Sequence, residues 1–142
     1  MKSIKAIVLF ICITAFSQAN AQKSQKEIDR EKNKVEIFSD EEKANLQLHF
    51  YDKTKAMNLS EEVEEDYYRL VLHYIYDMRR LNDKDNNNSD EEVKQGLKTL
   101  TETMNSKIKP ILSKDDYQTH LNNFNDLLDS VYRKNGWIRA EN

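Results

Sequence analysis

Two stretches of this chain carry apolar residues at the same spacing. From Val63 and again from Val93, the apolar positions advance by four, three, four, four and three residues. Steps of three and four place residues along one side of an α-helix, and the short polar segment 82–89 separates the two rows. We therefore expect an antiparallel helical hairpin. The two rows are Val63, Tyr67, Leu70, Tyr74, Met78 and Leu81, and Val93, Leu97, Leu100, Met104, Ile108 and Ile111.

Serine residues mark the expected helix starts. Ser39 followed by Glu42, and Ser89 followed by Glu92, have the spacing of a capping box. The first pair predicts a helix over about 40–57, with a buried face of Leu46, Phe50, Tyr51, Thr54 and Met57. A further helix is expected after residue 113, with Tyr117, Leu121, Phe124, Leu128 and Val131 on one side, and it should stop near Gly136.

The composition also favours helices. The 142 residues include only two Gly and one Pro, a third of them are charged, and no stretch alternates apolar and polar residues over the length of a strand. We predict an all-α fold: a small antiparallel helical bundle or hairpin of about four helices over residues 39–138. Whether this domain forms a homodimer is left open.

The first 21 residues have the pattern of a secretory signal peptide. Lys2 and Lys5 precede an apolar run over 6–16, and a small-x-small sequence ends at Ala21, after which we expect cleavage. The segment also contains Cys12, and a lipoprotein anchor requires a cysteine there. However, the bulky residues before it disfavour a stable membrane anchor. The protein is therefore expected to be periplasmic or secreted. Residues 22–38 are predicted to be a flexible or frayed lead-in because they carry few apolar side chains.

The sequence gives little sign of catalysis or of a bound cofactor. A net charge of −3 disfavours electrostatic binding of nucleic acid, and two Gly leave no phosphate-binding loop. No catalytic, cofactor-binding or metal-ligating residue is assigned. His49, His73 and His120 fall on three expected helices without paired metal-ligand spacing, so we interpret them as solvated histidines. Metal binding stays open only if folding or dimerisation brings them together with carboxylates.

The helix over about 61–81 has more apolar residues than one neighbour can cover. Outside its main row lie Tyr68, Leu72, Ile75 and Tyr76. Tyrosine offers a broad contact area and a hydroxyl that tolerates water, as binding surfaces require. These four residues are our candidate partner-binding surface. The alternative is that the first or the fourth helix covers them.

Two segments resemble the repeated motif of a known family. Residues 56–63, AMNLSEEV, and 108–117, IKPILSKDDY, are similar to the two LTxxQ-type motifs of the Spy/CpxP-like periplasmic proteins. The matched positions are Leu59 and Ser60 in the first copy and Leu112 and Ser113 in the second, with Ser in place of the family's Thr. Val63 and Asp116 stand where the family has Gln, which puts the contact made by that Gln in doubt.

This resemblance implies a non-enzymatic protein with a thin helical fold. Members of the family include ATP-independent chaperones and envelope-stress or metal sensors. We therefore expect an ATP-independent periplasmic chaperone or envelope-stress protein that binds unfolded clients. The alternative is a regulatory module that binds one dedicated partner, such as a membrane sensor, and is tuned by metal.

Overall fold

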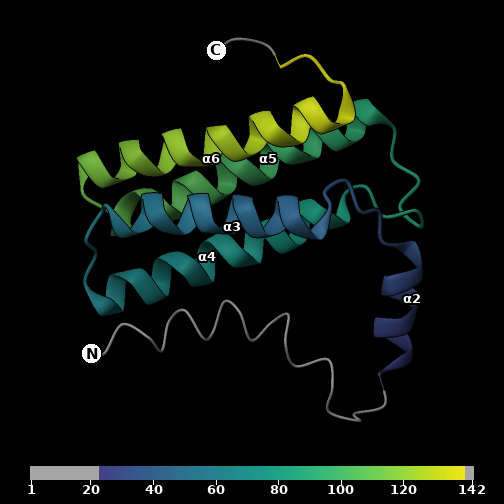
Figure 1. Cartoon of the computed structure of the whole chain (residues 1–142), viewed down its shortest axis with the longest axis horizontal. Helices are drawn as coiled ribbons and strands as arrows, with labels where there is room; N and C mark the ends of the chain where they lie inside the picture. Colours follow the sequence, from purple (N-terminus) through teal and green to yellow (C-terminus); the bar gives the residue numbers. More distant parts are fainter. Residues whose placement is uncertain (1–22, 140–142) are drawn as a thin grey trace. The chain divides into compact units, whose positions relative to one another are not determined.

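The computed structural model of the chain describes residues 23–139, and every regular element among them is helical (Figure 1). The prediction of an all-α fold is therefore confirmed. The expected signal peptide, residues 1–21, and Gln22 lie outside the described residues. The elements in order are α2 (Gln25–Asn33), α3 (Asp40–Lys55), α4 (Glu61–Arg80), α5 (Asp90–Ile108), the 3₁₀ turn η1 (Lys109–Ile111) and α6 (Lys114–Asn135).

The chain divides into two units between Lys32 and Asn33. Nearly all of α2 belongs to the first unit. This helix has no buried residue, and the Ser24 hydroxyl accepts a hydrogen bond from the Glu27 N–H at its start. The second unit contains α3 to α6 and all the sites described below.

Helices α3 to α6 each begin at a serine whose hydroxyl accepts a backbone N–H, as the sequence predicts. Both capping boxes form: Glu42 N–H donates to Ser39 Oγ, and the Glu42 carboxylate accepts from Ser39 N–H at 2.8 Å. A cap of this kind stabilises a helix by about 0.5–2 kcal/mol. The capping serines are Ser39, Ser60, Ser89 and Ser113.

The helix ends also follow local chemistry. Helix α3 ends at Lys55, two residues before the expected Met57, and Asn58 then takes a left-handed conformation with φ of 50°. Pro110 cannot donate an N–H, and it lies in the 3₁₀ turn that follows α5. Gly136 takes φ of 68° and ends α6, as predicted, because glycine adopts this conformation without a steric penalty.

Helices α3 to α6 bury one shared apolar core, and in Figure 1 each runs opposite in direction to the helix before it. Each of these helices contributes large side chains, and the two predicted rows supply most of those from α4 and α5. Val71 is an exception: it is buried although it lies outside the predicted row. The buried apolar residues are Phe50, Met57, Tyr67, Val71, Tyr74, Met78, Val93, Leu97, Met104, Ile108, Phe124 and Leu128.

Gly96 allows a close approach between the end of α4 and α5. A Cβ atom at Gly96 would lie 2.7 Å from Cδ2 of Leu81, closer than two carbon atoms normally come. Glycine in a helix costs up to about 1 kcal/mol relative to alanine. Here the missing side chain makes room for Leu81, which packs against the core.

The asparagine-rich loop after α4 acts as a cap for that helix. Asn86 Nδ2 donates to the carbonyl of Arg80, and Asn88 Nδ2 donates to the carbonyl of Leu81 at 2.9 Å. The Arg80 carbonyl also accepts the backbone N–H of Asp83, and the Leu81 carbonyl lies just beyond the last turn of α4, where the helical pairing of carbonyls ends. The side-chain amide of Asn86 therefore adds a second donor at Arg80, and that of Asn88 supplies a donor at Leu81.

Trp137 folds back onto the helices after α6 ends. Its indole Nε1 donates to the Asp90 carboxylate at 2.9 Å, and its ring meets Tyr132 edge-on with centroids 5.5 Å apart. The next residue, Ile138, does not follow it and is 91% exposed. One aromatic side chain thus joins the end of α6 to the start of α5.

Candidate functional site

The predicted partner-binding residues of α4 divide between the core and the surface. Tyr68 and Ile75 are partly buried and pack against the core, so neighbouring helices cover part of them. Leu72 is half-buried, and Tyr76 is 42% exposed. We call Tyr68, Leu72, Ile75 and Tyr76 the α4 stripe, since they lie near one another along α4. Its outer part is formed by Leu72 and Tyr76.

Helix α3 lies beside the start of the α4 stripe. Lys55 of α3 pairs with Glu64 of α4 at 2.9 Å. Burial raises the pKa of the Tyr68 hydroxyl to about 12, although a hydrogen bond with Thr54 lowers it. The nearby Glu64 and Tyr51 raise this pKa further. This places Tyr51 of α3 near the stripe.

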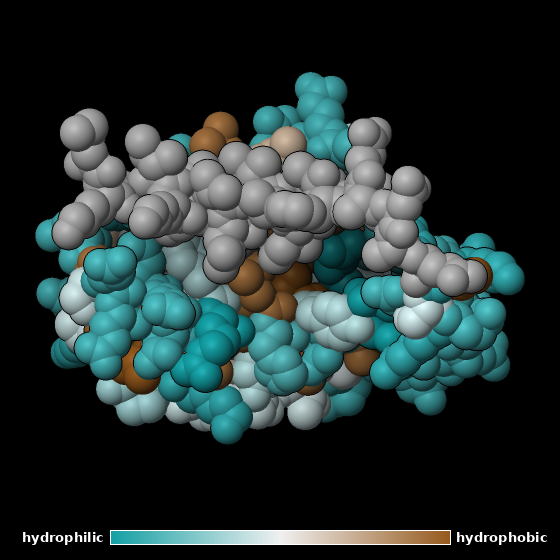
Figure 2. All heavy atoms as spheres, turned by 90° about the horizontal axis from the view of Figure 1, so that it is seen from below, coloured by the Kyte–Doolittle hydropathy of each residue, from teal (hydrophilic) through white to brown (hydrophobic). Residues whose placement is uncertain are grey.

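Leu48 lies one helical turn before Tyr51 on α3, and it is 60% exposed. Figure 2 shows one face of the molecule, on which the described hydrophobic side chains form small separate areas among hydrophilic ones. Among the described residues, Leu48 and Tyr76 are the large hydrophobic side chains of α3 and α4 that are exposed, so the exposed apolar surface of these helices comes from few side chains.

The motif positions lie at helix starts. Ser60 and Ser113 cap α4 and α6, accepting from the N–H of Val63 and of Asp116. Leu59 and Leu112, the residues before them, are partly buried and pack against the core. Each motif copy thus joins a helix start to the core, and its serine is engaged in a local hydrogen bond.

The three histidines have different environments. His49 and His73 are exposed, and each has its Nε2 3.7 Å from a neighbouring carboxylate, Asp126 and Asp77 respectively. The interpretation as a solvated side chain is wrong for His120, which is fully buried. Over residues 23–139, no three His, Cys, Asp or Glu side chains lie close enough together to hold a metal ion.

His120 belongs to a hydrogen-bonded network that joins three helices. Its Nε2 lies 2.9 Å from Oδ1 of Asn105 on α5, and its Nδ1 lies 3.0 Å from the hydroxyl of Tyr67 on α4. The amide oxygen can only accept, so Nε2 carries the proton and Nδ1 accepts from Tyr67. Burial lowers the pKa of His120 to about 4 and raises that of Tyr67, so both side chains are neutral at pH 7.

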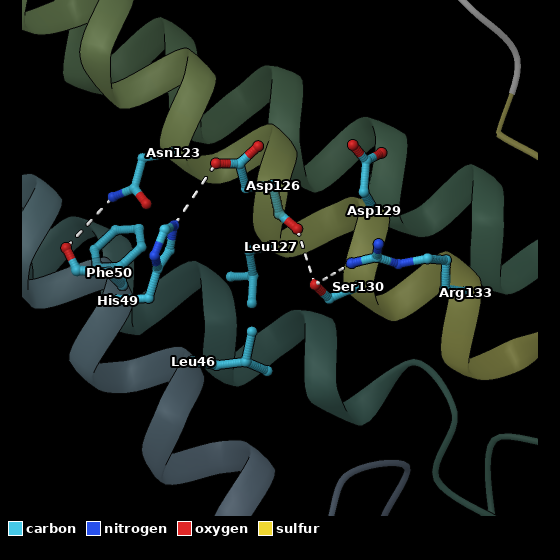
Figure 3. Close-up of a pocket in the computed structure, with 9 residues that line it drawn as sticks. All are labelled: Leu46, His49, Phe50, Asn123, Asp126, Leu127, Asp129, Ser130 and Arg133. Carbon is cyan, nitrogen blue, oxygen red and sulfur yellow. Dashed lines mark hydrogen bonds and ion pairs between the residues drawn. The ribbon is translucent and has the colours of Figure 1, made fainter.

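A hollow of about 360 Å³ opens between α3 and α6 (Figure 3). Leu46 and Leu127 lie in its middle, with Asn123 and Asp126 at one end and Arg133 at the other. A neighbouring hollow of about 420 Å³ shares three lining residues with it. The residues common to both are Leu46, Ser130 and Arg133.

Asn123 gives this hollow an unusual polar group. The residue is 3% exposed, and its Nδ2 donates to the carbonyl of Phe50 at 3.4 Å. Its Oδ1 is buried and accepts no hydrogen bond from the described residues. An unpaired buried acceptor costs about 1–3 kcal/mol, so this enclosed oxygen lowers the stability of the packing between α3 and α6.

The sequence patterns did not indicate this hollow. Asn123, Asp126, Ser130 and Arg133 recur at steps of three, four and three on α6, a spacing that places polar residues on one side of a helix. That signal is visible in the sequence. However, only the position of α3 shows that this side faces another helix and does not simply face solvent.

Comparison with known proteins gave no relative of this chain: no family model, no curated protein and no solved structure matches it. The resemblance to the Spy/CpxP-like proteins therefore stays a prediction from its two motif segments. None of the helices in the described part of the chain is both long and apolar enough to cross a membrane.

Proposed function

We propose that this protein is a non-enzymatic binding protein that holds unfolded chains on the apolar surface of α3 and α4, as an ATP-independent periplasmic chaperone or envelope-stress protein. The observation that carries the proposal is the exposure of apolar side chains on both helices: Leu48 on α3 and Tyr76 on α4 are exposed, and Leu72 on α4 is half-buried. Exposed apolar groups surrounded by polar residues are typical of protein-binding surfaces.

The charged surroundings of this surface suit weak and reversible binding. Charged and polar groups around the α4 stripe include the Lys55–Glu64 pair and the exposed His73. Apolar burial is proportional to the area removed from water, at about 25 cal/mol per Å². An area as small as this one would therefore bind a client weakly and release it without a nucleotide-driven step.

The experiment is aggregation of a chemically denatured model client with the protein from Gln22 to Asn142, without ATP. We expect suppression at near-stoichiometric amounts. Replacing Leu72 and Tyr76 by Ser should reduce it several-fold with helicity unchanged by circular dichroism, because these two residues form the outer part of the stripe. Tyr68 and Ile75 are left intact, since they pack against the core.

The matched control replaces Ile138 by Ser. This residue is the most exposed large apolar side chain among the described residues and lies outside the stripe. Equal loss of activity in the control and in the Leu72→Ser/Tyr76→Ser variant would show that suppression follows general hydrophobicity. Unchanged suppression in the folded double variant would remove the stripe as the binding surface.

The small size of the exposed area also favours a second candidate function, a module that binds one dedicated partner such as a membrane sensor's domain. A stable specific interface normally buries about 800 Å² on each partner, which would need the polar surroundings as well as the stripe. This reading predicts capture of one protein at a defined stoichiometry and no effect on unrelated clients. A homodimer through the same surface would show as a concentration-dependent mass in sedimentation experiments.

A further inference from the structure

The hollow between α3 and α6 has three chemically different parts arranged in a line. Asn123 and Asp126 lie at one end, apolar Leu46 and Leu127 lie in the middle, and Arg133 lies at the other end (Figure 3). At the first end the Asp126 carboxylate is an acceptor that lies beside His49, and at the other end Arg133 presents only donors. A ligand that fills the hollow must therefore carry donors at one end, an apolar body and acceptors at the other end.

The charges at the two ends are available to a ligand. The Asp126 carboxylate pairs only with His49 among the described residues, at 3.7 Å, which is a weak pairing. Arg133 donates to Ser130 Oγ at 3.2 Å and pairs with no carboxylate of residues 23–139. By contrast, Asp129 points away from Leu46 and pairs with Arg139, and Lys134 pairs with Glu42 at 2.6 Å.

The spacing of these groups sets the length of the ligand. Asp126 and Arg133 are seven residues apart on one helix, which corresponds to about 10 Å along the axis at 1.5 Å per residue. An extended peptide covers about 3.3–3.6 Å per residue, so about three residues span this distance. A free amino acid is too short to reach both ends.

We propose that this hollow binds a short free peptide of about three residues with an aliphatic side chain. Its amino group donates to the Asp126 carboxylate, which lines the hollow. Its aliphatic side chain packs between Leu46 and Leu127, and its carboxylate accepts hydrogen bonds from Arg133. The Asp126 carboxylate, whose pairing with His49 at 3.7 Å is weak, gives the amino end its specificity through a charge-assisted hydrogen bond.

This site has other residues than the surface proposed for clients, because Leu48, Leu72 and Tyr76 do not line the hollow. Failure of client binding would leave the peptide site untouched. Failure of peptide binding would likewise leave the chaperone proposal standing.

The test is titration of the isotope-labelled protein with alanyl-leucyl-alanine, followed by backbone amide shifts in NMR spectra. We expect saturable shifts at Leu46, Asn123 and Leu127. The same peptide acetylated at its amino end and amidated at its carboxyl end should bind about tenfold or more weakly, because charge-assisted hydrogen bonds are lost. Free leucine should also bind at least about tenfold more weakly, since it cannot span the site.

Variants of the protein test which residue binds each end of the peptide. Arg133→Gln should weaken binding of the free peptide about tenfold and leave binding of the amidated peptide unchanged, since only the carboxylate needs the guanidinium. Asp126→Asn should weaken both, because it removes the negative charge that pairs with the amino group of either peptide. The control is Lys98→Gln, a change at an exposed residue of α5 that does not line the hollow.

Three results would overturn the proposal. The first is the absence of saturable shifts up to about 10 mM peptide, which would mean a dissociation constant too high for useful binding. The second is equal affinity for the free and the blocked peptide. The third is equal affinity for leucine and the tripeptide. Because these comparisons vary the ligand and use the unaltered protein, they hold even where a variant does not fold.

Discussion

The pair of helices α4 and α5 and the pair α3 and α6 have different interiors, although the same serine caps begin all four. The buried residues of α4 and α5 are Tyr, Val, Leu, Ile and Met, and Gly96 lets Leu81 approach closely. Those of α3 and α6 include Thr54, His120 and Asn123, and two hollows lie between these helices. Dense apolar packing supports stability, whereas polar groups and empty volume leave room for a ligand.

The largest expected effect tests whether stability resides mainly in the α4–α5 pair. Met104 is fully buried, so Met104→Ala should lower the free energy of unfolding by about 2–5 kcal/mol. Leu46→Ala, at a residue that lines the hollow, should cost less than about 1 kcal/mol, because solvent already reaches this site. Urea unfolding followed by circular dichroism measures both. Equal losses would show that the two pairs contribute alike.

The next effect concerns the network of His120, Tyr67 and Asn105, which connects α6 to the α4–α5 pair. The pKa of His120 is lowered to about 4 in the folded protein, from an ordinary value of 6.5. The unfolded chain therefore binds more protons between these pH values, and stability falls as the pH drops from 6.5 through 4. The shift corresponds to about 3 kcal/mol at 1.36 kcal/mol per pKa unit.

His120→Gln provides the comparison, because glutamine keeps a donor and an acceptor but does not titrate in this range. Unfolding in urea at several pH values should show a steeper loss for the unaltered protein than for the variant. The groups that contact the imidazole are the aromatic side chains of Tyr67, Tyr117 and Phe124, together with Asn105. None is a carboxylate, and parallel pH profiles would contradict the assignment.

A smaller effect tests the close approach at Gly96. Gly96→Ala alone should change the free energy of unfolding little, because the gain in helix propensity of about 1 kcal/mol is offset by displacement of Leu81. In a Leu81→Ala background the same change should stabilise the protein by about 1 kcal/mol. The difference is a coupling energy, measured in a double-mutant cycle. Full additivity would mean that Leu81 is not held against this glycine.

The smallest effect concerns the interior of the α3–α6 pair. Asn123→Leu removes a buried acceptor that no described donor satisfies, and it fills the site with a side chain of similar size. We expect a gain of up to about 1 kcal/mol in the free energy of unfolding, by thermal or urea unfolding. A clear loss would mean that the weak bond from Asn123 to the Phe50 carbonyl matters more than the unpaired oxygen.

The helix starts and the fold class could be predicted because their signals are local. A capping serine and the N–H that it accepts are three residues apart, so the sequence alone contains the interaction. The buried side of a helix was predicted less well. Leu70 and Val71 are adjacent and both apolar, and only the neighbouring helices determine that Val71 is the one fully buried.

The buried polar residues could not be predicted for the same reason. His120 and Tyr67 are 53 residues apart, and Asn123 and Phe50 are 73 residues apart. A polar residue can be buried only when such a partner is present, and no short-range pattern announces it. The candidate partner stripe was named from the sequence, but its division into covered and exposed parts depends on α3.

The asparagine side chains at the end of α4 make this helix end sensitive to slow hydrolysis of their amides. Asn86 and Asn88 hold the last carbonyls of α4 through their NH₂ groups, and asparagine is among the residues that are chemically labile over time. Hydrolysis of either amide replaces a donor with a negatively charged acceptor that faces a carbonyl at the negative end of the helix dipole. The packing at the end of α4, where Leu81 meets Gly96, is therefore expected to weaken with time as these amides hydrolyse.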